Sequence, residues 1–171
     1  LLGENRVIVD KGLKILHNPK RIGIRAIMEV AGVLDKPLNA STIAFSIAPR
    51  LNAAGRLGSA ATAVELLLTN DESRARELAL LLDTENKERQ QTERQIFDEA
   101  LELIAKDPNF EKKKVIVLAQ ENWHQGVIGI VASRLCDMYY KPCILISHTN
   151  GVGKGSGRSI KGFNLFDALT H

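Results

Sequence analysis

The glycine-rich stretch Gly151–Ser159, which reads GVGKGSGRS, has the composition of a phosphate-binding strand. Glycine alternates with a side chain four times, and alternate residues of an extended chain share a face. Lys154, Ser156 and Arg158 would therefore project together, while the opposite face would be bare backbone. Because cations, a hydroxyl and exposed amides form an anion receptor, we expect phosphate to bind at Lys154, Ser156, Gly157, Arg158 and Ser159.

Known phosphate loops do not account for this stretch. Lys154 is followed by glycine rather than Ser or Thr, which excludes a Walker A loop, and no glycine triplet has the GxGxxG spacing of dinucleotide-binding proteins. The alternative to a binding strand is a flexible glycine hairpin.

The turn Glu121–Gly126, which reads ENWHQG, is a second candidate site. It joins an expected strand to an expected helix, and ligands of open α/β sheets bind outside the carboxyl ends of strands. Trp123 beside His124 could stack on a base or bond a phosphate. In the structural alternative, Trp123 fills the interior of the domain and His124 caps the helix.

A third stretch, Arg50–Arg56, reads RLNAAGR and places two arginines and an amide around small residues. Arg50, Asn52 and Arg56 could contact a ligand that approaches the backbone closely. The alternative is helix–helix packing with exposed arginines. Pro49 should end the preceding helix, and the glycines that follow should prevent a simple continuation.

Metal ligands in the usual spacings are absent from the sequence. The four histidines, His17, His124, His148 and His171, form no HxH or HxxxH pair, and the chain has no DxD or CxxC. We therefore expect no metal centre built within this chain. No Ser-His-Asp arrangement can be argued either.

Charge and cysteine content narrow the class of protein. Residues 1–70 and 114–171 are basic and residues 71–113 are acidic, with a net charge of +3 overall. Basic ends suit nucleic acid, although ordinary solvated faces also explain so small an excess. Cys136 and Cys143 are expected to be buried thiols, and no apolar run could span a bilayer. The chain begins at Leu1 without Met or a signal peptide, so we expect a fragment of a cytoplasmic protein that has no membrane contact.

Apolar spacing predicts short helices in the first 70 residues, at Lys11–Leu16, Arg21–Val30, Asn39–Ile47 and Ala60–Leu68. A long helix should follow from Asp71 to about Lys106, because this stretch contains neither Pro nor Gly. Its middle, residues 83–95, has no apolar side chain, so we expect a connector that runs through solvent and is anchored at each end in a different core. Glu85, Glu88 and Asp98 should face solvent. Two helices with a loop are the alternative.

The last third of the chain predicts a parallel βαβ unit. Its strands are expected at Lys114–Ala119 and Pro142–Ser147, and its helix at Gly126–Tyr140. The inward side chains of that helix should be Val127, Ile130, Val131, Leu135 and Met138. A short helix should begin at Asn164, and the chain stops barely one turn into it, so this α/β domain is expected to be incomplete.

Taken together, these stretches resemble the RecJ family of single-strand-specific DNA exonucleases, which belongs to the DHH phosphoesterase superfamily. The resemblance covers nearly all of the chain and rests on APRLNAAGRLG, the long polar helix, ENWHQGVIGIVASRL, GKGSGRS and FNLFDAL. It implies an α/β architecture with a DNA-binding cleft. By this resemblance, residues 1–70 would be the helical end of a DHH catalytic domain, residues 71–106 the connector helix, and residues 107–171 the first part of a DHH-associated domain.

The resemblance also implies roles for individual residues. Arg50, Asn52 and Arg56 would face the cleft from the catalytic side. Ser156 and Arg158 would hold the terminal phosphate and the backbone of the strand, with Lys154 beside them. His124 corresponds to the histidine of the WHxG motif, near the scissile phosphate, where it would be an auxiliary catalytic residue. The ligands of two Mn²⁺ or Mg²⁺ ions would lie upstream of Leu1, so the chain alone should be inactive.

The implied function of the full-length protein is hydrolysis of single-stranded DNA from its 5′ end in recombination and repair. Single-strand-binding protein or a recombination helicase would be its protein partner. One alternative is a DHH-superfamily enzyme that acts on short oligonucleotides or cyclic dinucleotides, which has a glycine-glycine-His motif where this chain has GSGRS. The other is a non-enzymatic relative that binds nucleic acid.

Overall fold

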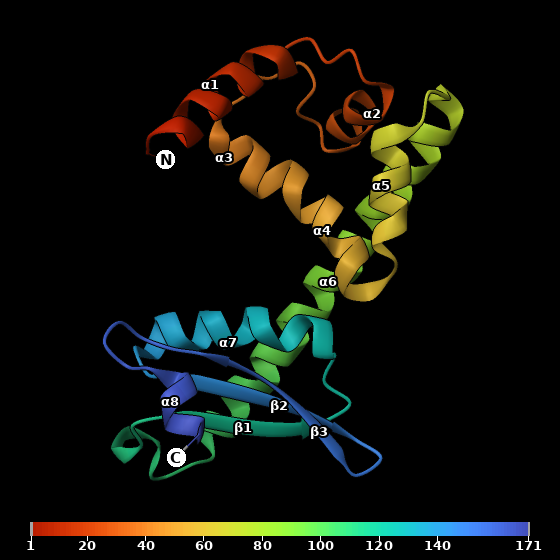
Figure 1. Cartoon of the computed structure of the whole chain (residues 1–171). Helices are drawn as coiled ribbons and strands as arrows, with labels where there is room; N and C mark the ends of the chain where they lie inside the picture. Colours follow the sequence, from red (N-terminus) through yellow and green to blue (C-terminus); the bar gives the residue numbers. More distant parts are fainter. Residues whose placement is uncertain (1, 171) are drawn as a thin grey trace. The chain divides into compact units, whose positions relative to one another are not determined.

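The computed structural model describes residues 2–170, apart from the side chain of Leu57, and divides into two compact units. Unit 1 comprises residues 1–89 and is helical, whereas unit 2 comprises residues 90–171 and contains a three-stranded sheet with helices (Figure 1). The predicted α/β class is therefore confirmed. None of the helices within residues 2–170 combines the length and the apolar composition of a membrane span.

Unit 1 is built from short helices and the first part of a long one. Its core includes Ile27, Met28, Leu66 and Leu82, all fully buried. A Cβ added at Gly23 would lie 1.7 Å from the carbonyl oxygen of Leu66, so the backbones meet here at a distance that only glycine allows. The elements are α1 (Glu4–Leu16), α2 (Ile22–Val30), α3 (Ala40–Thr42), a π-helical turn (Ile43–Ile47), α4 (Ala48–Leu57), α5 (Ala60–Leu68) and the start of α6 (Glu72–Ala105).

Contrary to the sequence prediction, Pro49 does not end a helix. The elements α3, Ile43–Ile47 and α4 follow one another without a break. A proline inside a regular α-helix lacks a donor and clashes with the carbonyl four residues earlier. Here the wider π-helical turn precedes it, with the amide of Ala48 donating to the carbonyl of Ile43. Pro49 then lies in the first turn of α4, where proline is tolerated.

The helix α6 is continuous over 34 residues, as predicted, but its middle is not solvated on all sides. Asp83, Asn86 and Arg89 are only 7%, 3% and 9% exposed. Their three-residue spacing puts them on one face of the helix. Asp83 accepts a hydrogen bond from Arg50 of α4, at 2.8 Å, and pairs with Lys87, also at 2.8 Å. The sequence pattern misled because polar side chains that satisfy one another can be buried.

Glu85 also departs from the prediction, whereas Glu88 and Asp98 are exposed as expected. Oε1 of Glu85 lies 2.7 Å from the position that a Cβ on Gly58 would take. Its Oε2 is buried and has no hydrogen-bond partner among the described residues. Burial, and to a lesser extent the charge of Glu88, raises the pKa of Glu85 above its ordinary value. Unit 1 therefore contains a carboxylate that is costly to ionise.

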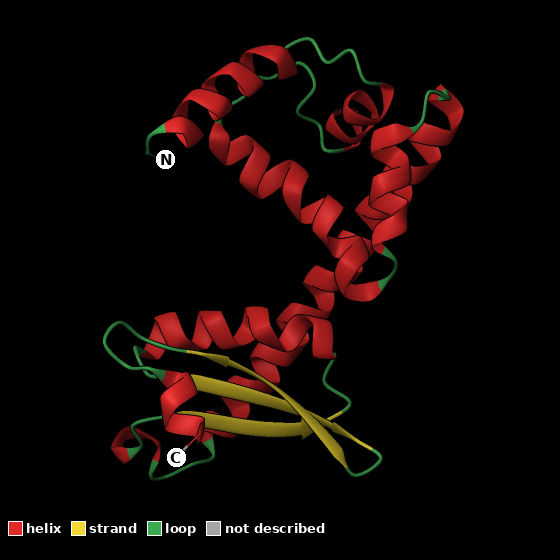
Figure 2. Ribbon diagram, viewed as in Figure 1, coloured by secondary structure: helices red, strands yellow, loops and turns green. Residues whose placement is uncertain are grey.

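Unit 2 forms the predicted βαβ unit and adds an antiparallel strand (Figure 2). The strands β1 (Ile116–Glu121) and β2 (Cys143–Thr149) are parallel, and β3 (Val152–Arg158) pairs with β2 in antiparallel register. Both predicted strands exist, shifted by one or two residues towards the C-terminus. The helix α7 (Gln125–Tyr139) connects β1 to β2, and α8 (Leu165–Thr170) begins after Asn164 as expected.

The core of unit 2 confirms most of the predicted inward positions of α7. Val127, Val131 and Leu135 are fully buried, but Met138 is 56% exposed and that prediction is wrong. At this end of α7 the neighbouring Tyr139 makes the apolar contact instead, with its ring against that of Phe110. Cys136 and Cys143 are buried free thiols, and burial raises the pKa of Cys143 to about 12. The second part of α6 contributes Ile96, Phe97, Ala100 and Ile104.

Replacing Glu85 with Gln should stabilise the chain at neutral pH. Because the folded-state pKa of Glu85 is raised, its ionisation opposes folding above that pKa and has no effect below the ordinary value of 4.5. Urea unfolding should therefore give Glu85→Gln a higher midpoint at pH 7, and the gain should shrink at pH 4. Asp98→Asn, an exposed change on the same helix, is the control. An equal gain at both pH values would show that the added stability does not come from removing the ionisation of Glu85.

Candidate nucleic-acid interface

The predicted phosphate strand is β3, and it is an ordered member of the sheet. Lys154 is the register partner of Ser147, and Arg158 that of Cys143. The turn before it has positive φ at Asn150 (52°) and Gly151 (78°), which is typical of a type I′ hairpin. A hairpin turn is therefore present at Asn150 and Gly151, as the alternative interpretation expected. The residues that follow the turn form a strand, as the first interpretation expected.

The side chain of Arg158 is held by a network of hydrogen bonds. Its Nε donates to Oγ of Ser133 in α7 at 3.0 Å, and its Nη1 donates to Oγ of Ser156 at 3.2 Å. Nη1 also donates to the carbonyl of Gly157 at 2.6 Å. Within residues 2–170 no carboxylate pairs with Arg158, so its charge is positioned without being neutralised. Ser156 and Arg158 therefore lie together as predicted.

The glycine face of β3 is not bare backbone, contrary to the prediction. A Cβ on Gly157 would lie 2.6 Å from Leu165 of α8, and one on Gly155 would lie 3.5 Å from Ile146 of β2. Apolar side chains thus cover this face, because the missing side chains leave room for them.

Lys154 and Ser159 lie on either side of the Ser156–Arg158 pair in the sequence. Lys154 is exposed. Ser159 Oγ donates to the carbonyl of Phe163 at 2.7 Å, which stabilises the turn before α8. The hydroxyl of Ser159 thus already has a structural role.

Both structural alternatives for the turn before α7 are correct. Trp123 is 4% exposed, and its Nε1 donates to Oε2 of Glu99 in α6 at 2.7 Å. His124 is the N-cap of α7, where its Nδ1 accepts from the amide of Gly126 at 3.1 Å. An accepting Nδ1 places the proton on Nε2, so the exposed ring of His124 keeps one donor for a ligand.

The three predicted residues of α4, Arg50, Asn52 and Arg56, lie in different surroundings. Arg50 is paired with the buried carboxylate of Asp83 and is 18% exposed, so its charge is committed to the fold. Asn52 and Arg56 are exposed and lie four residues apart on one side of the helix. Ala53 and Ala54 are fully buried, which confirms that small residues serve helix packing here. These residues belong to unit 1, whereas His124 and β3 belong to unit 2.

Asp83 itself is held ionised. Burial raises its pKa, but the hydrogen bond from Lys87 and the charge of Arg50 outweigh burial, so that the pKa is lowered from its ordinary value. Arg50 therefore stabilises the packing of α4 against α6 in unit 1.

Sequence reasoning missed two residues of the site in unit 2, Gly129 and Ser133. A Cβ on Gly129 would lie 2.8 Å from Oγ of Ser156 and 2.9 Å from Nη2 of Arg158. Ser133 donates to the carbonyl of Gly129 at 3.2 Å while accepting from Arg158. A glycine inside an apolar helix was the available signal, because such a position needs a packing or functional reason.

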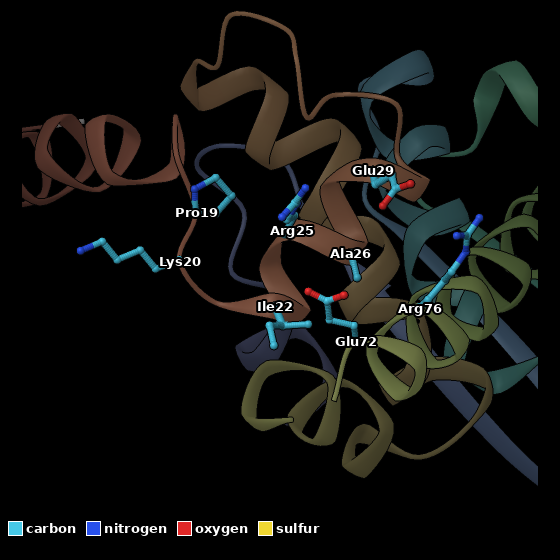
Figure 3. A pocket seen from close by; sticks show the side chains of 8 residues that line it. All are labelled: Pro19, Lys20, Ile22, Arg25, Ala26, Glu29, Glu72 and Arg76. Atoms are coloured by element: carbon cyan, nitrogen blue, oxygen red, sulfur yellow. The ribbon is translucent and has the colours of Figure 1, made fainter. Parts of the chain in front are cut away.

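The predicted site residues do not line a hollow of about 410 Å³ in unit 1 (Figure 3). Acidic and basic side chains alternate around it, as Figure 3 shows for Arg25, Glu29, Glu72 and Arg76. Lys20 also lines the hollow, so its three cationic side chains outnumber its two carboxylates, but Glu29 and Glu72 lie among them and oppose the binding of an anion. The β3 site therefore remains the better candidate for binding an anion.

Known proteins similar to this chain point to one family. Residues 112–171 match the DHHA1 domain. The chain is 42% identical over 169 residues to the single-stranded-DNA-specific exonuclease RecJ of Bacillus subtilis, covering 98% of this chain and 21% of that protein. It is 43% identical to the RecJ of Haemophilus influenzae, covering 96% of this chain and 29% of that protein. The chain thus spans about a fifth to three tenths of the length of these relatives.

Solved structures agree with the sequence relatives. The crystal structure of RecJ from Thermus thermophilus in complex with Mg²⁺ matches with a TM-score of 0.85 at 37% identity, over 99% of this chain and 26% of that one. A manganese-bound exonuclease RecJ matches with a TM-score of 0.82, over 41% of that chain. The DHHA1 match, taken together with the RecJ relatives and RecJ structures that match over nearly the whole chain, makes this chain part of the DHH superfamily. Within that superfamily the chain belongs to the RecJ type.

Substitutions at His124 should test its role as the N-cap of α7. His124→Ala removes the acceptor for the Gly126 amide and should cost about 0.5–2 kcal/mol of stability, whereas His124→Asn keeps a good N-cap and should cost little. Urea unfolding followed by the fluorescence of Trp123, the one tryptophan in the sequence, measures both. Equal losses for the two variants would show that the cap is not what His124 contributes to stability.

Proposed function

We propose that the full-length protein containing this chain is a single-strand-specific exonuclease that degrades DNA from its 5′ end, in recombination and repair. The chain itself binds the strand and its terminal phosphate. The relatives that match over nearly the whole chain are single-stranded-DNA-specific exonucleases by name, which supports the activity. The position of Arg158 supports the role of the segment.

The Arg158 guanidinium carries the argument for phosphate binding. Its charge lacks a carboxylate partner among residues 2–170, and three hydrogen bonds fix its orientation. A fixed, planar fork with unused donors suits the oxygens of a phosphate. Ser156 adds a hydroxyl on the same face, and Lys154 and Gly157 extend the proposed site along β3. Ser159 follows directly after β3 and completes the proposed site, although its hydroxyl already donates to the carbonyl of Phe163.

We assign supporting roles to the other predicted residues. The Nε2–H of His124 would donate to a phosphate oxygen near the scissile bond, steadying charge as the bond breaks. Asn52 and Arg56, which belong to unit 1, would contact the single-stranded DNA. Arg50 would act mainly by holding α4 through Asp83, because its charge is already neutralised there.

The chain is not proposed to hold the metal ions itself. Among residues 2–170 no three His, Cys, Asp or Glu side chains gather in a way that fits a metal ion. Solved relatives are complexes with Mg²⁺ or Mn²⁺, so we assign two such ions to other residues of the full-length protein. When bound, they would supply the activated water and neutralise the phosphate.

We propose domain boundaries on the same basis. Residues 1–70 would be the helical end of the DHH catalytic domain, 71–106 the connector helix and 107–171 the first part of the DHH-associated domain. The continuity of α6 from Glu72 to Ala105 and the DHHA1 match from residue 112 support these limits.

Arg158→Ala in the full-length protein should weaken binding of a 5′-phosphorylated single strand by roughly tenfold or more, since a hydrogen bond to a charged group is lost. Arg158→Lys should also be defective, because an ammonium cannot reproduce the guanidinium fork. Fluorescence anisotropy in a chelator, at one fixed salt concentration, measures binding without cleavage. Arg94→Ala, which removes an exposed arginine of α6, is the matched control. Unchanged binding by both Arg158 variants would count against the assignment.

The chain of residues 1–171 should not hydrolyse DNA by itself. Phosphodiester hydrolysis without a catalyst is extremely slow, and the proposed activity needs metal ions held by residues outside this chain. A 5′-labelled single strand incubated with the purified chain and Mn²⁺ should stay intact, while the full-length protein should degrade it. Degradation by the chain that a point change within it abolishes would overturn this division of roles.

A further inference from the structure

We propose that Gly129 and Ser133 of α7 are positioning residues that set the preference of the β3 site for a terminal phosphate over an internal one. This inference rests on the proposed function, because it takes Ser156 and Arg158 as the groups that receive the phosphate. It adds the residues that aim those groups, and with them the basis of specificity for the end of a strand.

Ser133 fixes the guanidinium from the helix side. Its Oγ donates to the carbonyl of Gly129 at 3.2 Å and accepts from Nε of Arg158 at 3.0 Å. A hydroxyl that donates to a backbone carbonyl has its oxygen lone pairs directed elsewhere, so Ser133 is set as an acceptor for Arg158. The guanidinium plane is therefore fixed to the backbone of α7 through a single side chain.

Gly129 provides the space in which the guanidinium lies. Nη2 of Arg158 is 2.9 Å, and Oγ of Ser156 is 2.8 Å, from the position that a Cβ on Gly129 would occupy. Any side chain at this position would displace both groups. The absence of a side chain thus lets Arg158 and Ser156 lie close to the helix backbone.

The fold itself does not require glycine at position 129. At Gly23 an added Cβ would meet a backbone carbonyl at 1.7 Å, whereas at Gly129 the nearest atoms it would meet are the ends of the Ser156 and Arg158 side chains. Those ends can move, and alanine is a better helix former than glycine. Stability alone would therefore favour alanine at 129, so the glycine serves the arrangement of Ser156 and Arg158.

The fixed orientation determines which donors remain for a ligand. The hydrogen bonds of Arg158 within the described residues use Nε and Nη1 and leave the two N–H groups of Nη2. Ser156 Oγ accepts from Arg158 and so keeps its own hydrogen to donate. A terminal phosphate monoester has more negative charge and more acceptor oxygens than an internal diester, so it gains most from donors held in place in advance.

The test compares a 5′-phosphorylated oligodeoxythymidine with the same strand bearing a 5′-hydroxyl, bound by the full-length protein in a chelator. Gly129→Ala and Ser133→Ala should each lower the ratio of the two affinities by about tenfold, the effect of one charge-assisted hydrogen bond. Ser133→Thr keeps the hydroxyl and should keep the ratio. Gly12→Ala in α1, where an added Cβ has open space, makes the same chemical change away from the site and should leave the ratio unaltered.

A second measurement distinguishes positioning from a structural role. In urea unfolding of the chain, followed by Trp123 fluorescence, Gly129→Ala should have an unchanged or higher midpoint. A lower midpoint together with a lost phosphate preference would mean that Gly129 serves the fold, and would overturn the inference.

Two further outcomes separate this inference from the proposed function. If Arg158→Ala removes the phosphate preference while Gly129→Ala and Ser133→Ala retain it, the inference fails and the proposed function stands. If the unaltered protein has no preference for the phosphorylated strand and Arg158→Ala binds as well as it does, both fail.

Discussion

The continuity of α6 is the constraint on which both cores depend. Its first part contributes Leu78 and Leu82 to the core of unit 1, and its second part contributes Ile96 and Phe97 to that of unit 2. A chain without Pro or Gly over this whole span has no residue that would favour a break. A single helix can therefore serve two hydrophobic cores while polar residues occupy the stretch between them.

The arginines Arg50, Arg134 and Arg158 use their charge in two different ways. In unit 1, Arg50 is committed to the buried Asp83, which ties α4 to α6. In unit 2, Arg134 lies 3.9 Å from the ring centroid of Phe97 and pairs with Glu93, which ties α7 to the second part of α6. Arg158 differs from both, because hydroxyls and a carbonyl hold it without neutralising it. That difference is what makes Arg158 suited to an external anion.

The βαβ unit brings two distant stretches of sequence to the same helix. His124 caps the start of α7, and Gly129 and Ser133 of the same helix hold the Ser156–Arg158 pair of β3. The parallel pairing of β1 and β2 and the antiparallel return of β3 set this arrangement. The step from His124 to Gly129 corresponds to about 7.5 Å of helix rise, so one helix can position both parts of the proposed phosphate site.

The sequence by itself determined the elements whose cause is local. The long helix follows from composition, the parallel unit from apolar runs around a helix, and the shared face of Ser156 and Arg158 from strand geometry. The resemblance to RecJ also came from local motifs, and the relatives confirm it. Each of these depends on residues close to one another in the chain, where periodicity and motif carry the information.

Only the tertiary structure decided which side chains were free to act. Arg50 and Arg158 both belong to stretches of sequence that contain several small residues, yet Arg50 is neutralised by a carboxylate 33 positions away and Arg158 is not. Asp83, Asn86 and Arg89 are buried although their segment is wholly polar, and Pro49 is accommodated by a π-helical turn. Burial and pairing depend on contacts between elements that are distant in the chain, and a local sequence pattern does not predict those contacts.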